Sequence, residues 1–141
     1  MKREILFRGK SIGTGEWLYG HLFKYGLTAP SNVPCICVCV PKSWEEAYNL
    51  YTVHPDTIGQ YTGLKDKNGK KIFEGDIVHI KGDGFDGKEV GVDYHRVVTF
   101  HDGMICLSVG DVFHMPINYY VHGLDDWDVV GNITDTPELM K

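Results

Sequence analysis

Three cysteines alternate along one short apolar segment, and they are the first residues whose type and spacing could do chemistry. Cys35, Cys37 and Cys39 stand two positions apart, so on a β-strand all three point to one face, with successive side chains about 6.6 Å apart. One tetrahedral zinc ion, with sulfur ligands at about 2.3 Å, does not collect them without a bend in the chain. Cysteine is also a small residue that is frequently buried. The pattern predicts thiols that line a core face, and a metal- or thiol-dependent enzyme is the alternative.

The seven histidines raise the same question of a metal site. No H-E-x-x-H or H-x-H unit occurs in the chain. His95 and His101 share the parity of one strand, but six residues place them about 20 Å apart. The acidic residues Asp83, Asp86 and Glu89 do not have the spacing of a calcium-binding loop. We therefore predict no metal and no cofactor.

The motifs of nucleophilic and phosphate chemistry are missing from the sequence. There is no G-x-S-x-G elbow and no P-loop, and no G-x-G-x-x-G follows an expected strand. A catalytic triad could be assembled from Cys106, a histidine and an aspartate, but almost any sequence of this composition offers such a set. We name no catalytic residue and no cofactor-binding residue, and the sequence favours a protein that is not an enzyme without deciding the question.

Four lysines form the only basic patch of the sequence, which consists of Lys65, Lys67, Lys70 and Lys71. Asp66 and Glu74 dilute this patch, and the whole chain carries a net charge of −5. A nucleic-acid-binding protein normally has a surplus of Lys and Arg, because neutralising phosphates supplies much of its affinity. The charge therefore predicts no strong general affinity for nucleic acid, although binding through these lysines stays open.

Aromatic residues and an uncharged segment indicate an interface. Aromatic residues make up 12% of the chain, and amphipathic rings are enriched at protein interfaces. The neighbouring rings of Tyr119 and Tyr120 are the candidate interface, with ordinary core and cross-strand packing as the alternative. Residues 33–40 carry no charge, so as an exposed sheet edge they would promote aggregation unless they are central or paired with another chain. We predict a homo-oligomer.

The elements that must position these residues are mostly strands and turns. Residues 16–24 alternate, with Trp17, Tyr19, His21 and Phe23 on one face. Residues 33–40 are apolar on both faces, as in a strand buried between layers. Ser43 and Glu46 are spaced as a capping box, which predicts a short helix over residues 44–50.

The second half of the chain has clear turn signals. Asn68-Gly69 predicts a hairpin with a type I′ turn, in which both central residues have positive φ. Residues 89–100 are the longest expected strand, and His101-Asp102-Gly103 turns the chain back. No window approaches the roughly 18 apolar residues of a membrane helix, and residues 1–10 lack the apolar stretch of a signal peptide. We expect a cytoplasmic protein, no contact with membranes, and cysteines that stay reduced.

Three segments in order resemble the YopX family of phage and prophage proteins. The first comprises residues 3–10 with residues 15–20, and the third comprises residues 130–133 with residues 137–140. The second, residues 59–78, is the most specific and has the sequence GQYTGLKDKNGKKIFEGDIV. Together they span nearly the whole chain.

The resemblance implies an all-β protein from a phage or an integrated element in a bacterial host, with an SH3-like barrel in its C-terminal half. It implies no reaction and no catalytic residues. We expect residues 1–58 to form an N-terminal β-rich region with one short helix, and residues 59–141 to form the C-terminal SH3-like β-barrel. The leading hypothesis is a non-enzymatic accessory protein that binds itself or an unidentified phage or host macromolecule. The alternative is a nucleic-acid-binding module that uses the barrel and the lysines of residues 65–71.

Overall fold

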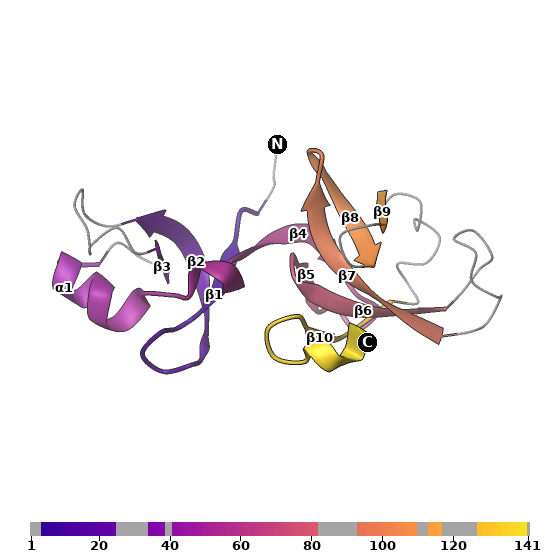
Figure 1. Ribbon diagram of the computed structural model, residues 1–141. Helices are drawn as coiled ribbons and strands as arrows, with labels where there is room; N and C mark the ends of the chain where they lie inside the picture. Colours follow the sequence, from indigo (N-terminus) through magenta and orange to yellow (C-terminus); the bar gives the residue numbers. More distant parts are fainter. Residues whose placement is uncertain are drawn as a thin grey trace. The chain divides into compact units, whose positions relative to one another are not determined.

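The regular elements of the computed structural model are almost all β-strands (Figure 1). The structure describes residues 4–24, 34–38, 41–81, 93–109, 113–116 and 127–140. The chain divides into two compact units, residues 1–61 and residues 62–141. Antiparallel pairing joins the strands within each unit. The predicted all-β fold with one short helix is therefore confirmed.

The first unit contains β1 (Phe7–Lys10), β2 (Trp17–Lys24), β3 (Pro34–Cys37) and the start of β4 (Gly59–Lys65), in the order β3-β2-β1-β4. β1 and β2 form a hairpin in which Lys10 lies opposite Trp17. The Ser11 N–H closes the loop by donating to the Glu16 carbonyl at 2.8 Å. Residues 11–16 thus form the turn between these two strands.

Two glycines let the strands of the first unit approach closely. A Cβ at Gly20 would lie 2.3 Å from the carbonyl oxygen of Cys37, where β2 passes β3. A Cβ at Gly9 would lie about 3 Å from the buried side chains of Ile36 and Val53. Side chains at either position would separate the strands from the small core beneath them.

The short helix begins where the capping box predicts. α1 (Trp44–Glu46) continues as a π-helical stretch, Ala47–Tyr51. The Ser43 hydroxyl accepts a hydrogen bond from the Glu46 N–H at 3.1 Å, and the Glu46 carboxylate accepts one from the Lys42 N–H at 2.6 Å. In an ideal capping box the Glu side chain binds the N–H of the cap residue, here Ser43. In this structure it binds the N–H of Lys42, the residue before the cap. A 3-10 turn, Pro55–Thr57, follows before β4.

β3 is shorter than the strand predicted over residues 33–40. All four of its residues are buried, as expected, but Val38 directly after it is exposed. Its outer edge is occupied by the chain that leaves the helix, because Cys35 bridges to Thr52 and the Val53 N–H donates to the Pro34 carbonyl at 3.1 Å. This edge therefore does not supply the unpaired strand on which the predicted self-association partly rested.

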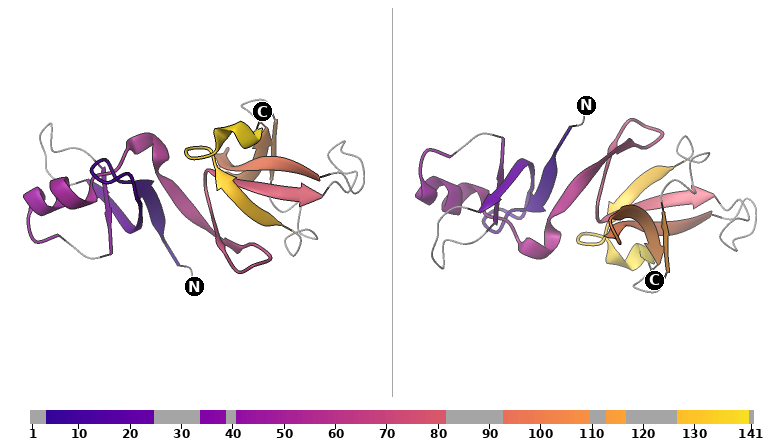
Figure 2. Two further views of the ribbon diagram at one scale, coloured as in Figure 1. Left: turned by 90° about the horizontal axis from the view of Figure 1, so that it is seen from below. Right: turned by 90° about the horizontal axis from the view of Figure 1, so that it is seen from above.

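The second unit is built on a five-stranded sheet in the order β10-β6-β7-β8-β9 (Figure 2). Its strands are β6 (Asp76–Lys81), β7 (Asp93–His101), β8 (Met104–Val109), β9 (Phe113–Pro116) and β10 (Asp128–Asn132). The second half of β4 and β5 (Lys71–Phe73) form a neighbouring hairpin. One face buries a core of Ile72, Val78, Ile80, Val98, Leu107 and Trp127.

The last 3-10 turn, Pro137–Met140, packs against β7 and β10. The Leu139 carbonyl lies 3.1 Å from Nδ1 of His95 on β7. On β10, a Cβ at Gly131 would lie 2.0 Å from the Thr136 hydroxyl, so only glycine leaves room for the turn. The tail is thus part of the fold of the second unit.

The strand order of the second sheet is open, from β10 to β9, across the residues that the structure describes. The SH3-like barrel therefore stays a prediction. Within the described ranges, no helix is long and apolar enough to cross a membrane.

Candidate functional surfaces

The cysteines are placed as core residues. Cys35 and Cys37 lie on one face of β3, opposite Phe23 and His21, and both are buried. Burial raises the pKa of the Cys35 thiol, and the neighbouring Cys37 raises it further. The Cys35 S–H donates to the Ala47 carbonyl at 3.7 Å. Cys39 lies outside the described residues.

Cys106 lies on β8 and is also buried. Burial raises the pKa of its thiol, and the charge of Asp102 raises it further. A hydrogen bond from the backbone of His101 lowers the pKa, but by less than the other two effects raise it. Because the thiolate is the nucleophilic form, a raised pKa makes a thiol less reactive. Over the described ranges, no three His, Cys, Asp or Glu side chains are grouped so that they could hold a metal ion.

Asp66 organises the most specific part of the sequence, the hairpin between β4 and β5. Its Oδ1 accepts hydrogen bonds from the N–H groups of Asn68 and Lys70, both at 2.9 Å. Its Oδ2 accepts one from the Val129 N–H of β10 at 3.0 Å. Burial opposes the charge of Asp66, but these three hydrogen bonds and the charge of Lys70 outweigh it and lower the pKa of the carboxyl. The carboxylate thus fixes the turn and ties it to β10.

The turn at Asn68-Gly69 is not the predicted type I′ turn. Gly69 has a φ of 80°, but among the described residues Asp102 is the only non-glycine residue with positive φ, so Asn68 does not have it. The Gly69 N–H donates to the Asp66 carbonyl at 3.0 Å, and the Asp66 N–H donates to the Lys70 carbonyl at 2.8 Å. The prediction was wrong because the Asp66 carboxylate binds the Asn68 N–H and holds a type I turn followed by a left-handed glycine.

A second aspartate holds the bend before β6. Asp76 is buried, and its Oδ2 accepts a hydrogen bond from the Phe73 N–H at 2.7 Å. Gly75 has a φ of 91° and donates its N–H to the Val98 carbonyl at 2.7 Å. The two acidic side chains of this segment whose contacts are described here therefore serve the backbone.

The predicted lysine patch lies on the same hairpin. Lys65, Lys67 and Lys70 are exposed and Lys71 is half-buried. The Lys67 ammonium lies 3.9 Å from the Asp128 carboxylate. Residues 62–141 contain 8 Lys and Arg against 14 Asp and Glu, a net charge of −6, whereas residues 1–61 contain 6 against 5, a net charge of +1. The lysines thus stand on the acidic unit.

Basic and aromatic side chains share one face of the β1–β2 hairpin. Arg8 lies opposite Tyr19, and Lys10 lies opposite Trp17. The Arg8 guanidinium carbon is 4.8 Å from the centroid of the Trp17 ring, and the Lys10 ammonium is 5.9 Å from it. The alternation of residues 16–24 predicted the face of the rings, but the register that adds the two cations becomes visible only in the structure.

Two histidines that sequence analysis did not connect face each other across β6 and β7. His79 lies opposite His95, with ring centroids 5.8 Å apart. The His79 Nε2 is 3.4 Å from the Asp93 carboxylate, and His95 contacts the C-terminal turn. Comparing histidines along one strand could not find this pair, because it depends on the pairing of two strands.

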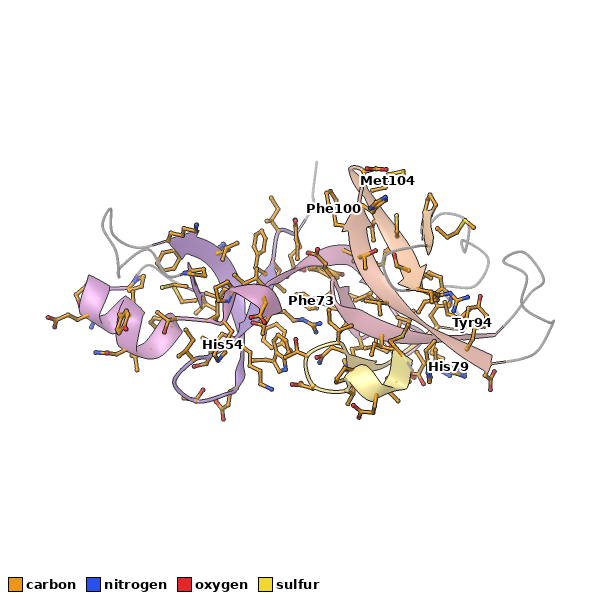
Figure 3. All side chains as sticks on the ribbon, viewed as in Figure 1. His54, Phe73, His79, Tyr94, Phe100 and Met104 are labelled. Carbon is orange, nitrogen blue, oxygen red and sulfur yellow. The ribbon has the colours of Figure 1, made fainter. Side chains whose placement is uncertain are left out.

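An apolar end is formed by the β7–β8 hairpin. Phe100 is 64% exposed and Met104 is 45% exposed, on either side of the turn Asp102-Gly103. Phe100 pairs with Ile105 and Met104 pairs with His101, so the two side chains lie on opposite faces of the hairpin end. Figure 3 shows both side chains at this end of the hairpin, and His79 and Tyr94 toward the opposite end. The predicted interface residues Tyr119 and Tyr120 lie outside the described residues.

The YopX protein family matches residues 6–141 of the chain, which is nearly its whole length. The chain belongs to the YopX family. No curated protein matches the chain. The crystal structure of protein EF1440 from Enterococcus faecalis is similar, with 24% identity and a TM-score of 0.55 over 99% of this chain and 100% of that one. This likeness shows that the fold is shared.

Proposed function

We propose that the chain is a non-enzymatic binding module of a phage or prophage, acting in the cytoplasm of a bacterial host. The phage origin and the bacterial location rest on the family resemblance. We also propose that residues 59–141 form an SH3-like barrel, because the link from Asp66 to Val129 brings the β4–β5 hairpin against an edge strand of the sheet. A hairpin packed against a curved antiparallel sheet is how a small barrel would be assembled.

The observation that carries the proposal is the apolar end of the β7–β8 hairpin. Four potentially reactive side chains among the described residues have structural uses: Cys35 and Cys106 are buried, and Asp66 and Asp76 hold turns. Phe100 and Met104, in contrast, are exposed at the end of a hairpin. Exposed apolar patches on small proteins mark binding surfaces, and aromatic residues and Met are enriched in interfaces.

We infer that one partner of this end is a second copy of the chain. The covered edge of β3 removes one route to self-association, and the exposed end of the β7–β8 hairpin offers another. A two-fold interface uses the same surface on both subunits, so the end of the β7–β8 hairpin, with Phe100 on one face and Met104 on the other, is enough for a dimer.

Sedimentation velocity at micromolar concentration tests this proposal. We expect the unaltered protein to sediment as a species of at least twice 15.9 kDa, and the double variant Phe100→Ser with Met104→Ser to sediment as a monomer. The matched control is Leu50→Ser, since Leu50 is 56% exposed in the other unit and should leave the assembly unchanged. A single species near 15.9 kDa for the unaltered protein would contradict the proposal.

A nucleic-acid-binding barrel that uses Lys65, Lys67, Lys70 and Lys71 is the second candidate function. The exposure of three of these lysines favours it. The ion pair of Lys67 with Asp128 and the net charge of −6 on the same unit weigh against it. If this candidate is correct, a variant with all four lysines changed to Gln should lose nucleic-acid binding.

A further inference from the structure

The β1–β2 face, formed by Arg8, Lys10, Trp17 and Tyr19, combines rings with cations. The two rings occupy alternate positions of one strand, so they lie about 6.6 Å apart along it. Tyr19 is 46% exposed, whereas Arg8 is buried with its guanidinium against the Trp17 ring. Arg8 thus places a positive charge against the Trp17 ring, and the exposed Tyr19 presents a flat aromatic surface on the same face of the hairpin.

The electrostatics of this face differ from those of the rest of the protein. The strands of the first unit, β1 to β3 and the start of β4, contain Arg8, Lys10 and Lys24 and no Asp or Glu. The strands of the other sheet carry Asp76, Asp93 and Asp128 together with Lys81 and Arg96. Residues 62–141 as a whole have a net charge of −6, against +1 for residues 1–61. An anionic partner is therefore attracted to the first unit and repelled by the second.

We propose that the β1–β2 face binds single-stranded nucleic acid. Tyr19 stacks on a base, and Lys10 contacts a neighbouring phosphate. The inference rests on the proposed function as a binding module, but it uses a surface other than the end of the β7–β8 hairpin. Failure here would leave the self-association of the protein untouched, and a monomeric protein could still bind a strand.

The chemistry of the face selects a single strand over a duplex. Rings on a sheet stack on bases only where the bases are unpaired, and this stacking tolerates any sequence because every base has a π-face. In a duplex the bases are paired, so a protein contacts mainly the phosphates, and affinity for phosphates depends on a large surplus of Lys and Arg. A net charge of −5 gives no such surplus, so ring stacking must carry most of the affinity.

Fluorescence anisotropy with a labelled oligothymidine of about 15 nucleotides tests the proposal. We expect Tyr19→Ala to weaken binding about 5-fold or more, since stacking of this kind is lost with the ring. Tyr19→Phe keeps the ring and should keep the affinity. Lys10→Gln should make the slope of log K against log salt shallower by about 0.7. A duplex of the same length should bind more weakly than the single strand.

Matched controls separate this surface from others. Tyr48 is also 46% exposed in the first unit, and Tyr48→Ala should leave binding unchanged. Thermal unfolding of each variant establishes that the fold is retained. The proposal is overturned if the unaltered protein does not bind the single strand, or if Tyr19→Ala and Tyr48→Ala weaken binding equally. It is equally overturned if the change of Lys65, Lys67, Lys70 and Lys71 to Gln abolishes binding while Tyr19→Ala does not weaken it.

Discussion

Two hairpins of the second unit carry nearly the same turn sequence and fold differently. Between β7 and β8, Asp102 and Gly103 have φ values of 50° and 78°, and His101 pairs directly with Met104. This is the two-residue turn that an Asp-Gly or Asn-Gly pair is expected to form. Between β4 and β5, only Gly69 of the pair Asn68-Gly69 has positive φ.

The difference lies in what the nearby aspartate binds. The carboxylate of Asp102 is 80% exposed and lies 3.3 Å from Nε2 of the neighbouring His101. The carboxylate of Asp66 is buried and accepts three backbone N–H groups, one of them from β10, sixty-three residues away. The form of this turn therefore follows the bonds of the Asp66 carboxylate to Asn68 and Lys70, and its bond to Val129 ties the turn to β10.

The two turns should differ most in stability when each aspartate is changed to asparagine. In Asp66→Asn the amide NH₂ must face at least one of three N–H donors, so we expect a loss of about 2 kcal/mol or more of unfolding free energy. Asp102→Asn keeps a residue that tolerates positive φ and should change stability by less than about 0.5 kcal/mol. Urea unfolding of both variants at pH 7 measures the difference. Equal losses would show that Asp66 has no special place in the fold.

The two glycines should respond alike, because each has a left-handed backbone in its turn. Gly69 and Gly103 have φ values of 80° and 78°, and neither has an atom within 4 Å of an added Cβ. Gly69→Val and Gly103→Val should each cost about 1–3 kcal/mol from backbone strain. Gly13, whose φ is outside the left-handed range, is the control, and Gly13→Val should cost clearly less. An unchanged melting temperature for Gly69→Val would show that the hairpin does not need a left-handed glycine at this position.

Local patterns predicted the elements better than their contacts. The strand predicted over residues 16–24, the helix start at Ser43 and the turn at Asp102-Gly103 depend on residues close in sequence, and all three are present. The prediction of a type I′ turn at Asn68 was wrong because the Asp66 carboxylate, two residues earlier, binds the N–H groups of Asn68 and Lys70. The predicted strand over residues 33–40 is described only as Pro34–Cys37.

The candidate surfaces depended even more on strand register. The ring-bearing face of β2 could be predicted from period-two alternation, and so could the common face of Cys35 and Cys37. The placement of Arg8 and Lys10 beside those rings, and of His79 opposite His95, requires knowing which strands pair and in which register. No short-range pattern carries that information.

Asp66 and Asp76 of the family's most specific segment hold its backbone, and Asp66 is the clearest case. The pH dependence of unfolding tests it most directly. The folded pKa of Asp66 is lowered, so its carboxylate stabilises the protein fully above the ordinary pKa of about 4, and this stability is lost as the pH falls through the folded value.

Unfolding free energies of the unaltered protein and Asp66→Asn should therefore be compared at a series of pH values from neutral downward. We predict that the unaltered protein is the more stable at neutral pH, and that the gap narrows as the pH falls below about 4. Two parallel curves, with the same gap at every pH, would contradict the account.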